Sequence, residues 1–162
     1  MKAGRQMTSR QAVLESLEQM KRLTESEDTA RIRSAWLQSI KDLFVKFEGW
    51  LQTARDRDLL QVRRGEVALS EERLGDYSAP GLTIAIPGGL TISIVPRARF
   101  VAGASGRVDF HFPPREAALL QRTNGDWEFA ILDDRLGYRM VPLNEESFWM
   151  TIGKLIGRES AW

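Results

Sequence analysis

The chain contains 162 residues, of which 43% are hydrophobic and 28% are charged, and its formal net charge is +1 at pH 7. This length and apolar fraction suit one ordinary domain with its own core and argue against disorder. A net charge so close to zero gives no global field that would attract nucleic acid or an anionic membrane.

The cysteine count and the apolar runs exclude further classes. The sequence has no cysteine, so it holds no disulfide, thiolate nucleophile or cysteine-ligated metal site. No apolar run approaches the roughly 20 residues of a membrane-spanning helix, and the first residues lack the apolar segment of a secretory signal. We therefore expect a soluble, cytoplasmic protein without membrane contact.

Two helices are predicted at the start of the chain. Thr8 and Gln11 form a capping-box pattern, which predicts a first helix over residues 9–23. The acidic stretch at 24–28 is interpreted as a break, and a second, longer helix is predicted over 28–60. Its apolar side chains form two adjacent rows, which is typical of a helix buried against a sheet; a coiled-coil interface is the alternative. The rows consist of Ile32, Trp36, Ile40, Leu43, Phe47, Trp50 and Ala54, and of Leu37, Phe44 and Leu51.

The clearest signal in the chain is a β-hairpin over residues 82–95. A two-residue loop at Gly88-Gly89 would split the aliphatic side chains between the two faces of the hairpin. A three-residue loop at 87–89 places all the large ones on a single face, so we predict the three-residue loop. The expected pairs are Ile86 with Leu90, Ile84 with Ile92, and Leu82 with Ile94.

The other strands are weaker predictions. Residues 66–73 form a short strand or edge segment, 75–81 a loop and 97–102 a strand. In 107–112, alternation turns Val108, Phe110 and Phe112 to one face. The Asn124-Gly125 pair predicts a hairpin between 116–122 and 127–132. In this hairpin Arg122 pairs with Trp127, and its side chain lies on the indole ring. A short last strand is expected at 138–141.

A closing helix is predicted from its cap and its apolar stripe. Asn144 caps it, Gly157 stops it, and the stripe contains Phe148, Trp149, Ile152, Leu155 and Ile156. Helices followed by consecutive antiparallel strands and a helix indicate an α+β fold, with a meander of about six strands covered by the long and the closing helix. We expect a single domain over 1–162, with a helical part at 8–62, the sheet at 66–142 and the closing helix at 144–157.

Catalytic and metal-binding constellations are sparse. His111 and Asp109 share one strand face and could serve as base and orienting acid, with Ser93 or Ser105 as nucleophile, but such a pair usually belongs to a solvated face. The carboxylate pairs lie at turns or a helix start, where acids are ordinary, and no phosphate-binding loop follows the glycines at 88–89. We therefore expect no catalytic residue, no cofactor and no metal.

Two sets of residues are candidates for binding. If Pro96 does not shift the strand register, a polar sheet face gathers Arg97, Arg99, Arg107, Asp109 and His111, and could grip phosphates or an acidic protein. Tryptophan is over-represented among interface anchors, which makes Trp36, Trp50 and Trp162 candidates for docking a partner.

The expected function is that of a non-enzymatic accessory or adaptor protein. It would act through protein–protein contact, as a homo-oligomer or as a subunit of a larger assembly. The alternative is binding to a nucleic-acid backbone through the arginine-bearing face, which would weaken steeply with salt. A small hydrolase or a ligand pocket around His111 is the third possibility.

Overall fold

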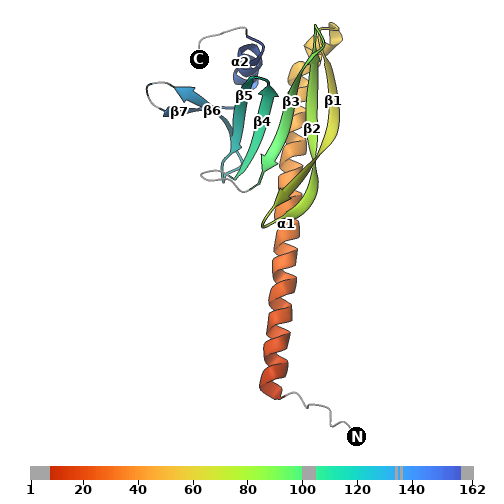
Figure 1. The fold of residues 1–162 in the computed structure, drawn as a ribbon, viewed down its shortest axis with the longest axis vertical. Coiled ribbons are helices and arrows are strands. Elements are labelled where there is room, and N and C mark those ends of the chain that lie inside the picture. Colours follow the sequence, from red (N-terminus) through yellow and green to blue (C-terminus); the bar gives the residue numbers. More distant parts are fainter. Residues whose placement is uncertain (1–7, 100–104, 134, 136, 158–162) are drawn as a thin grey trace.

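The computed structural model describes residues 8–99, 105–133, 135 and 137–157, without the side chains at 23–25, 132 and 133. A long helix, α1 (Ser9–Asp56), precedes seven strands and a closing helix, α2 (Glu145–Leu155), as Figure 1 shows. The strands are β1 (Gln61–Glu71), β2 (Gly75–Ile86), β3 (Leu90–Ala98), β4 (Gly106–Phe112), β5 (Arg115–Gln121), β6 (Trp127–Asp133) and β7 (Gly137–Pro142). They pair antiparallel in sequence order. The α+β meander is confirmed, with seven strands where about six are predicted.

The N-terminal helix is continuous over 48 residues, so the predicted break at 24–28 is wrong. That segment contains no glycine or proline, and its serine, threonine and aspartate each cost at most about 0.7 kcal/mol relative to alanine in a helix. Asp28 also accepts a hydrogen bond from Arg31 one turn later, which supports the helix locally. The predicted start is confirmed, because Thr8 and Gln11 make the reciprocal bonds of a capping box.

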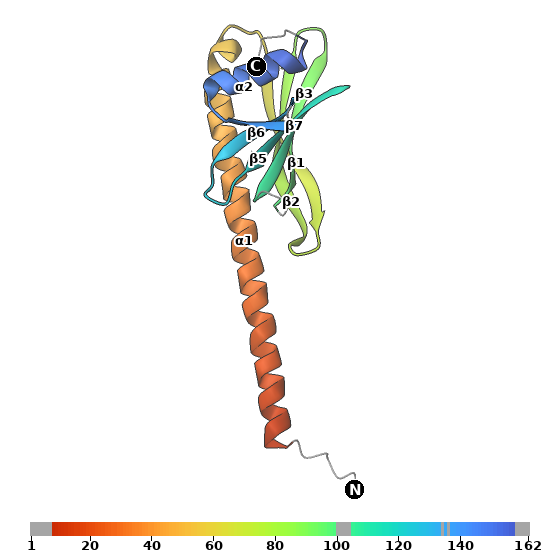
Figure 2. The same ribbon diagram turned by 90° about the vertical axis from the view of Figure 1, so that its left-hand side faces the viewer.

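The C-terminal half of α1 lies along one face of the sheet, and α2 packs beside it on the same face (Figures 1 and 2). Both predicted rows of α1 contribute to the core, which confirms burial for this half of the helix. The ring of Phe47 stacks on Phe148 of α2 at 4.9 Å and meets Phe110 of β4 edge-on at 5.5 Å. Six side chains of α1 are almost fully buried, namely Trp36, Ile40, Leu43, Phe44, Phe47 and Leu51.

The closing helix has the predicted cap but a slightly different buried face. Asn144 accepts a hydrogen bond from the backbone N–H of Ser147, and Phe148, Ile152 and Leu155 are buried. Ile156 is exposed, contrary to prediction, because the helix ends at Leu155 and the chain turns away there.

The hairpin of β2 and β3 has the predicted register, with Leu82 opposite Ile94, Ile84 opposite Ile92 and Ile86 opposite Leu90. The loop therefore contains three residues, and Gly88 and Gly89 both take positive φ angles. Leu82, Ile84, Ile92 and Ile94 are almost fully buried, whereas Leu90, next to the loop, is 54% exposed.

The predicted loop at 75–81 is instead the first half of β2, paired with β1 along its whole length. The less exposed positions change from odd numbers (half-buried Tyr77, buried Ala79) to even numbers (buried Leu82 and Ile84) within this strand, so the hairpin turns its other face inward. The change occurs where Gly81 lies opposite Gly65, and a Cβ at Gly81 would lie only 2.9 Å from Cγ2 of Val67. Glycine and proline composition suggests a loop here, but strand pairing overrides it.

The hairpin of β5 and β6 has a register one residue away from the prediction. Leu119 lies opposite Phe129 and Gln121 opposite Trp127, because the turn holds three residues, 123–125, with Gly125 at φ +94°. Arg122 therefore does not lie on the ring of Trp127, and its Nε donates to Glu128 at 2.7 Å instead.

Candidate interaction surfaces

A β-bulge in β3 divides the predicted arginine face. Pro96 lies opposite Val108 and Ala98 lies opposite Arg107, so Arg97 is an extra residue between the two pairs. The shift sends Arg99 to the helix side of the sheet, where it lines a hollow with Trp36 and Ser39 of α1. The five predicted residues therefore do not form one continuous surface.

Arg97 and Arg107 converge on one buried carboxylate. Asp109 is 4% exposed and accepts from the Nε of Arg97 at 2.9 Å and from the Nε of Arg107 at 2.7 Å. The hydrogen bond to Asp109 raises the pKa of Arg107 above its ordinary value, so this guanidinium is cationic at any physiological pH. We call these three residues the Arg97–Asp109–Arg107 cluster; its two cations and one anion leave a net positive charge.

His111 is not oriented by Asp109. The carboxylate of Asp109 is taken up by the two arginines, and Nδ1 of His111 lies 3.9 Å from the Oε2 of Glu116, beyond hydrogen-bond distance. Ser93 is opposite His111 in the strand register, but within the described part of the chain no hydrogen bond joins their side chains. The described residues also contain no group of three or more acidic or histidine side chains suited to a metal ion.

The three candidate tryptophans have different environments. Trp36 is 1% exposed, so it serves the core and cannot anchor a partner, which corrects that prediction. Its Nε1 donates to the hydroxyl of Tyr77 at 3.2 Å; burial, and then a hydrogen bond to Glu71, raise the pKa of this phenol above its ordinary value. Trp50 is half-buried against Phe148, at 5.3 Å between ring centroids. Trp162 lies outside the described residues.

The N-terminal half of α1 is a surface that the prediction missed. Figures 1 and 2 show this half projecting from the sheet, and every residue from 8 to 22 is exposed. The large apolar side chains there are Val13, Leu14, Leu17 and Met20, with exposures of 57%, 49%, 54% and 62%. The length of the helix indicates this surface, because the sheet is too short to cover all of it. A continuous helix of 48 residues spans about 72 Å, whereas the longest strand, of 12 residues, spans about 40 Å.

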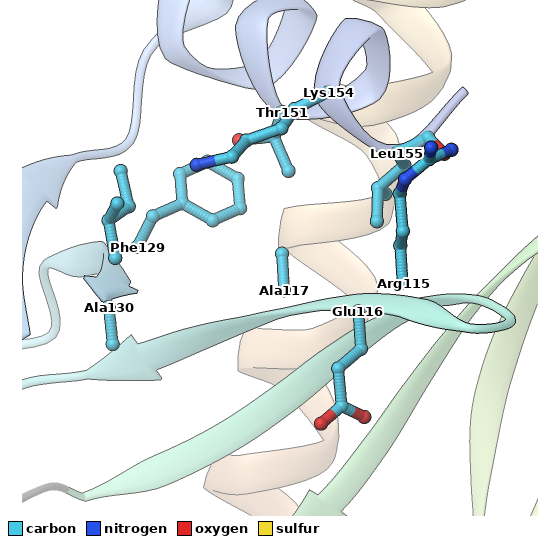
Figure 3. Close-up of a pocket in the computed structure, with 9 residues that line it drawn as sticks. Arg115, Glu116, Ala117, Phe129, Ala130, Thr151, Lys154 and Leu155 are labelled. Atoms are coloured by element: carbon cyan, nitrogen blue, oxygen red, sulfur yellow. The ribbon is translucent and has the colours of Figure 1, made fainter. Parts of the chain in front are cut away.

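The sheet also has hollows on both faces near β5 and β6. One, of about 290 Å³, lies under α2 and is lined by Ala117, Phe129 and Thr151 among others (Figure 3). Figure 3 also shows Glu116 and Ala130 pointing the other way, toward the open face. A second hollow, of about 580 Å³, lies on that open face.

Comparison with protein-family models, curated proteins and solved structures finds no match to this chain. Within the described ranges, neither helix combines the length and the apolar character needed to cross a membrane.

Proposed function

We propose that the protein is a non-enzymatic association module, in which the α+β body carries a projecting helix that pairs with the same helix of a second copy. The observation that carries this proposal is the exposed apolar stripe on the free-standing half of α1, formed by Val13, Leu14, Leu17 and Met20. Half of α1 is covered by its own sheet and the other half is not. Dimerisation would make the protein a building block or adaptor in a larger assembly.

The spacing of the stripe favours a helical partner. Val13, Leu17 and Met20 follow one another at intervals of four and three residues, the repeat by which two helices interlock side chains. Leu14 widens the stripe beside them. An isolated helix gains little stability in water, so a projecting helix with an apolar stripe gains most by packing that stripe against another helix.

A second copy suits the stripe better than a strongly charged partner would. Charges of both signs lie one helical turn from residues of the stripe, among them Arg10, Glu18 and Lys21, so two copies of this helix do not repel each other as two uniformly charged helices would. Two-fold pairing also places identical stripes face to face.

The expected dimer is weak. Four half-exposed side chains from each copy contribute about 1 kcal/mol each on burial, and association itself costs at least about 4 kcal/mol. The eight side chains together contribute about 8 kcal/mol, so at most about 4 kcal/mol remains, which corresponds to a dissociation constant of about 1 mM or weaker. Dimerisation should therefore depend on protein concentration.

Sedimentation velocity over a wide concentration range tests the proposal. The wild type should shift from monomer to dimer, and Leu17→Glu should remain monomeric because it buries a charge in the stripe. Gln19→Glu adds the same charge on the opposite side of the helix and should dimerise like the wild type. Circular dichroism should show that both variants keep the folded body. A wild type that stays monomeric at every concentration, or a Leu17→Glu variant that dimerises equally well, would refute the proposal.

A further inference from the structure

The strand register places two alanines, Ala118 and Ala130, side by side on the open face of the sheet. Asp109 of β4 lies opposite Ala118 of β5, Ala118 opposite Ala130 of β6, and Ala130 opposite Met140 of β7. Both helices pack on the other face (Figures 1 and 2). Alanine side chains are shorter than their neighbours, so this row is the floor of a groove that crosses the strands.

Larger side chains form the two walls of this groove. Arg107 and Leu120 lie opposite each other in the register on one side of the floor. Glu116 and Tyr138 line the hollow on the other side. The hollow of about 580 Å³ is within the size range of small-molecule sites. Three spacings between strands, of about 4.8 Å each, give it a length of about 14 Å from β4 to β7, which matches a body of two fused or linked rings.

The charges at the groove are asymmetric. The cationic end is the Arg97–Asp109–Arg107 cluster. Asp109 accepts from the Nε of both arginines and, at 3.4 Å, from Nη2 of Arg107, while the side chains of Arg97 and Arg107 stay 52% and 41% exposed. A guanidinium held in this way offers its remaining N–H groups to an oxyanion in a fixed geometry. Glu128, the acid beside Leu120, is paired with Arg122 and does not oppose an anion there.

We infer that this groove binds a small amphipathic anion. Its carboxylate or phosphate head lies at Arg107, and its flat apolar body lies on Ala118 and Ala130, against Tyr138 and Met140. Glu116, at the other wall, disfavours a second anionic group and accepts from a hydroxyl or amine of the ligand. The groove is separate from the stripe of α1, so binding of the anion does not depend on dimerisation.

Calorimetric titration with four probes tests this inference: 2-naphthoate, 2-naphthyl phosphate, 2-naphthalenemethanol and inorganic phosphate. At least one of the two naphthyl anions should bind. The anion that binds with the higher affinity shows whether the site prefers a carboxylate or a phosphate. The uncharged alcohol should bind about ten- to hundredfold more weakly, because it lacks the charge-assisted hydrogen bonds to the arginines. Inorganic phosphate should also bind more weakly, because it cannot use the alanine floor.

Two variants and a control locate the binding. Arg107→Gln removes the head-group contact, and Ala130→Leu fills the floor while leaving the Arg97–Asp109–Arg107 cluster intact; each should weaken binding about ten- to hundredfold. Arg64→Gln also removes an arginine, but one that pairs with Glu48 of α1, and should bind like the wild type. Amide NMR spectra should show that all three variants are folded. Absence of binding by both naphthyl anions, equal binding of the alcohol or of inorganic phosphate, or full affinity in Ala130→Leu would overturn the inference.

Discussion

Replacing Gly106 by alanine should force the ring of Trp36 out of its place in the core. A Cβ at Gly106 would lie 2.4 Å from Cζ3 and 2.8 Å from Cη2 of that ring. Carbon atoms pack at about 3.5–4.0 Å, so the ring would have to move by about 1 Å or more. Several contacts hold the ring of Trp36 in place: it is 1% exposed, its Nε1 donates to the hydroxyl of Tyr77, and it lies 6.1 Å from the ring of Trp127.

The expected cost of Gly106→Ala is that of overpacking a core, about 1–3 kcal/mol in the free energy of unfolding. For a chain of this length the melting temperature should fall by roughly 3–10 °C. Gly65 is the matched control, because it too lies in a strand but a Cβ there would meet nothing within 4 Å. Gly65→Ala should leave the free energy of unfolding unchanged or raise it by up to about 1 kcal/mol, through the lower entropy of the unfolded chain.

Urea denaturation followed by circular dichroism measures both variants. A double-mutant cycle with Trp36→Phe identifies the clash, because phenylalanine removes the outer ring that the new Cβ would meet. Gly106→Ala should cost less in the Trp36→Phe background than in the wild type. Equal stability of Gly106→Ala and Gly65→Ala would contradict the close approach of Trp36 to β4.

Three further predictions concern ionisation, capping and packing. In an ultraviolet titration, Tyr77 should ionise well above the pH of about 10 at which free tyrosine does, and Tyr77→Phe should remove this late phase while Tyr138→Phe keeps it. Because the pKa of Tyr77 is raised on folding, the stability that its neutral form contributes is complete below about pH 10 and is lost as the pH rises through the raised pKa. Asn144→Ala removes the acceptor at the start of α2 and should cost about 1 kcal/mol in urea denaturation, where an unchanged midpoint would contradict the cap. Phe148→Ala should cost about 3–5 kcal/mol in the same assay because its ring is fully buried, whereas the exposed Ile156→Ala should change stability by less than about 0.5 kcal/mol.

Elements with strong local periodicity could be predicted from the sequence. In the hairpin of β2 and β3, only the three-residue loop places Leu82, Ile84, Ile92 and Ile94 on one face, and that register is the one found. The buried half of α1 followed from its two apolar rows in the same way. In both cases the information lies within a few residues of the position it determines.

Turn composition was a poorer guide. The Asn124-Gly125 pair predicted the β5–β6 hairpin but not its register, since the same two residues serve a two-residue loop or the last two places of a three-residue loop. Because of this one-residue difference in register, Leu119 lies opposite Phe129 in the core, where Leu120 was predicted. The difference thereby leaves Leu120 on the open face, as a wall of the proposed groove.

The sequence by itself determined the α+β layering, most of the buried face of each helix and the register of the hairpin of β2 and β3, because side-chain spacing encodes which side of an element faces the core. Only the tertiary structure decided which surfaces remain open. How much of α1 is covered depends on the length of the strands packed against it, and the separation of Arg99 from Arg97 and Arg107 depends on one extra residue in β3. Both are relations between elements distant in the chain, which the local spacing of side chains does not record.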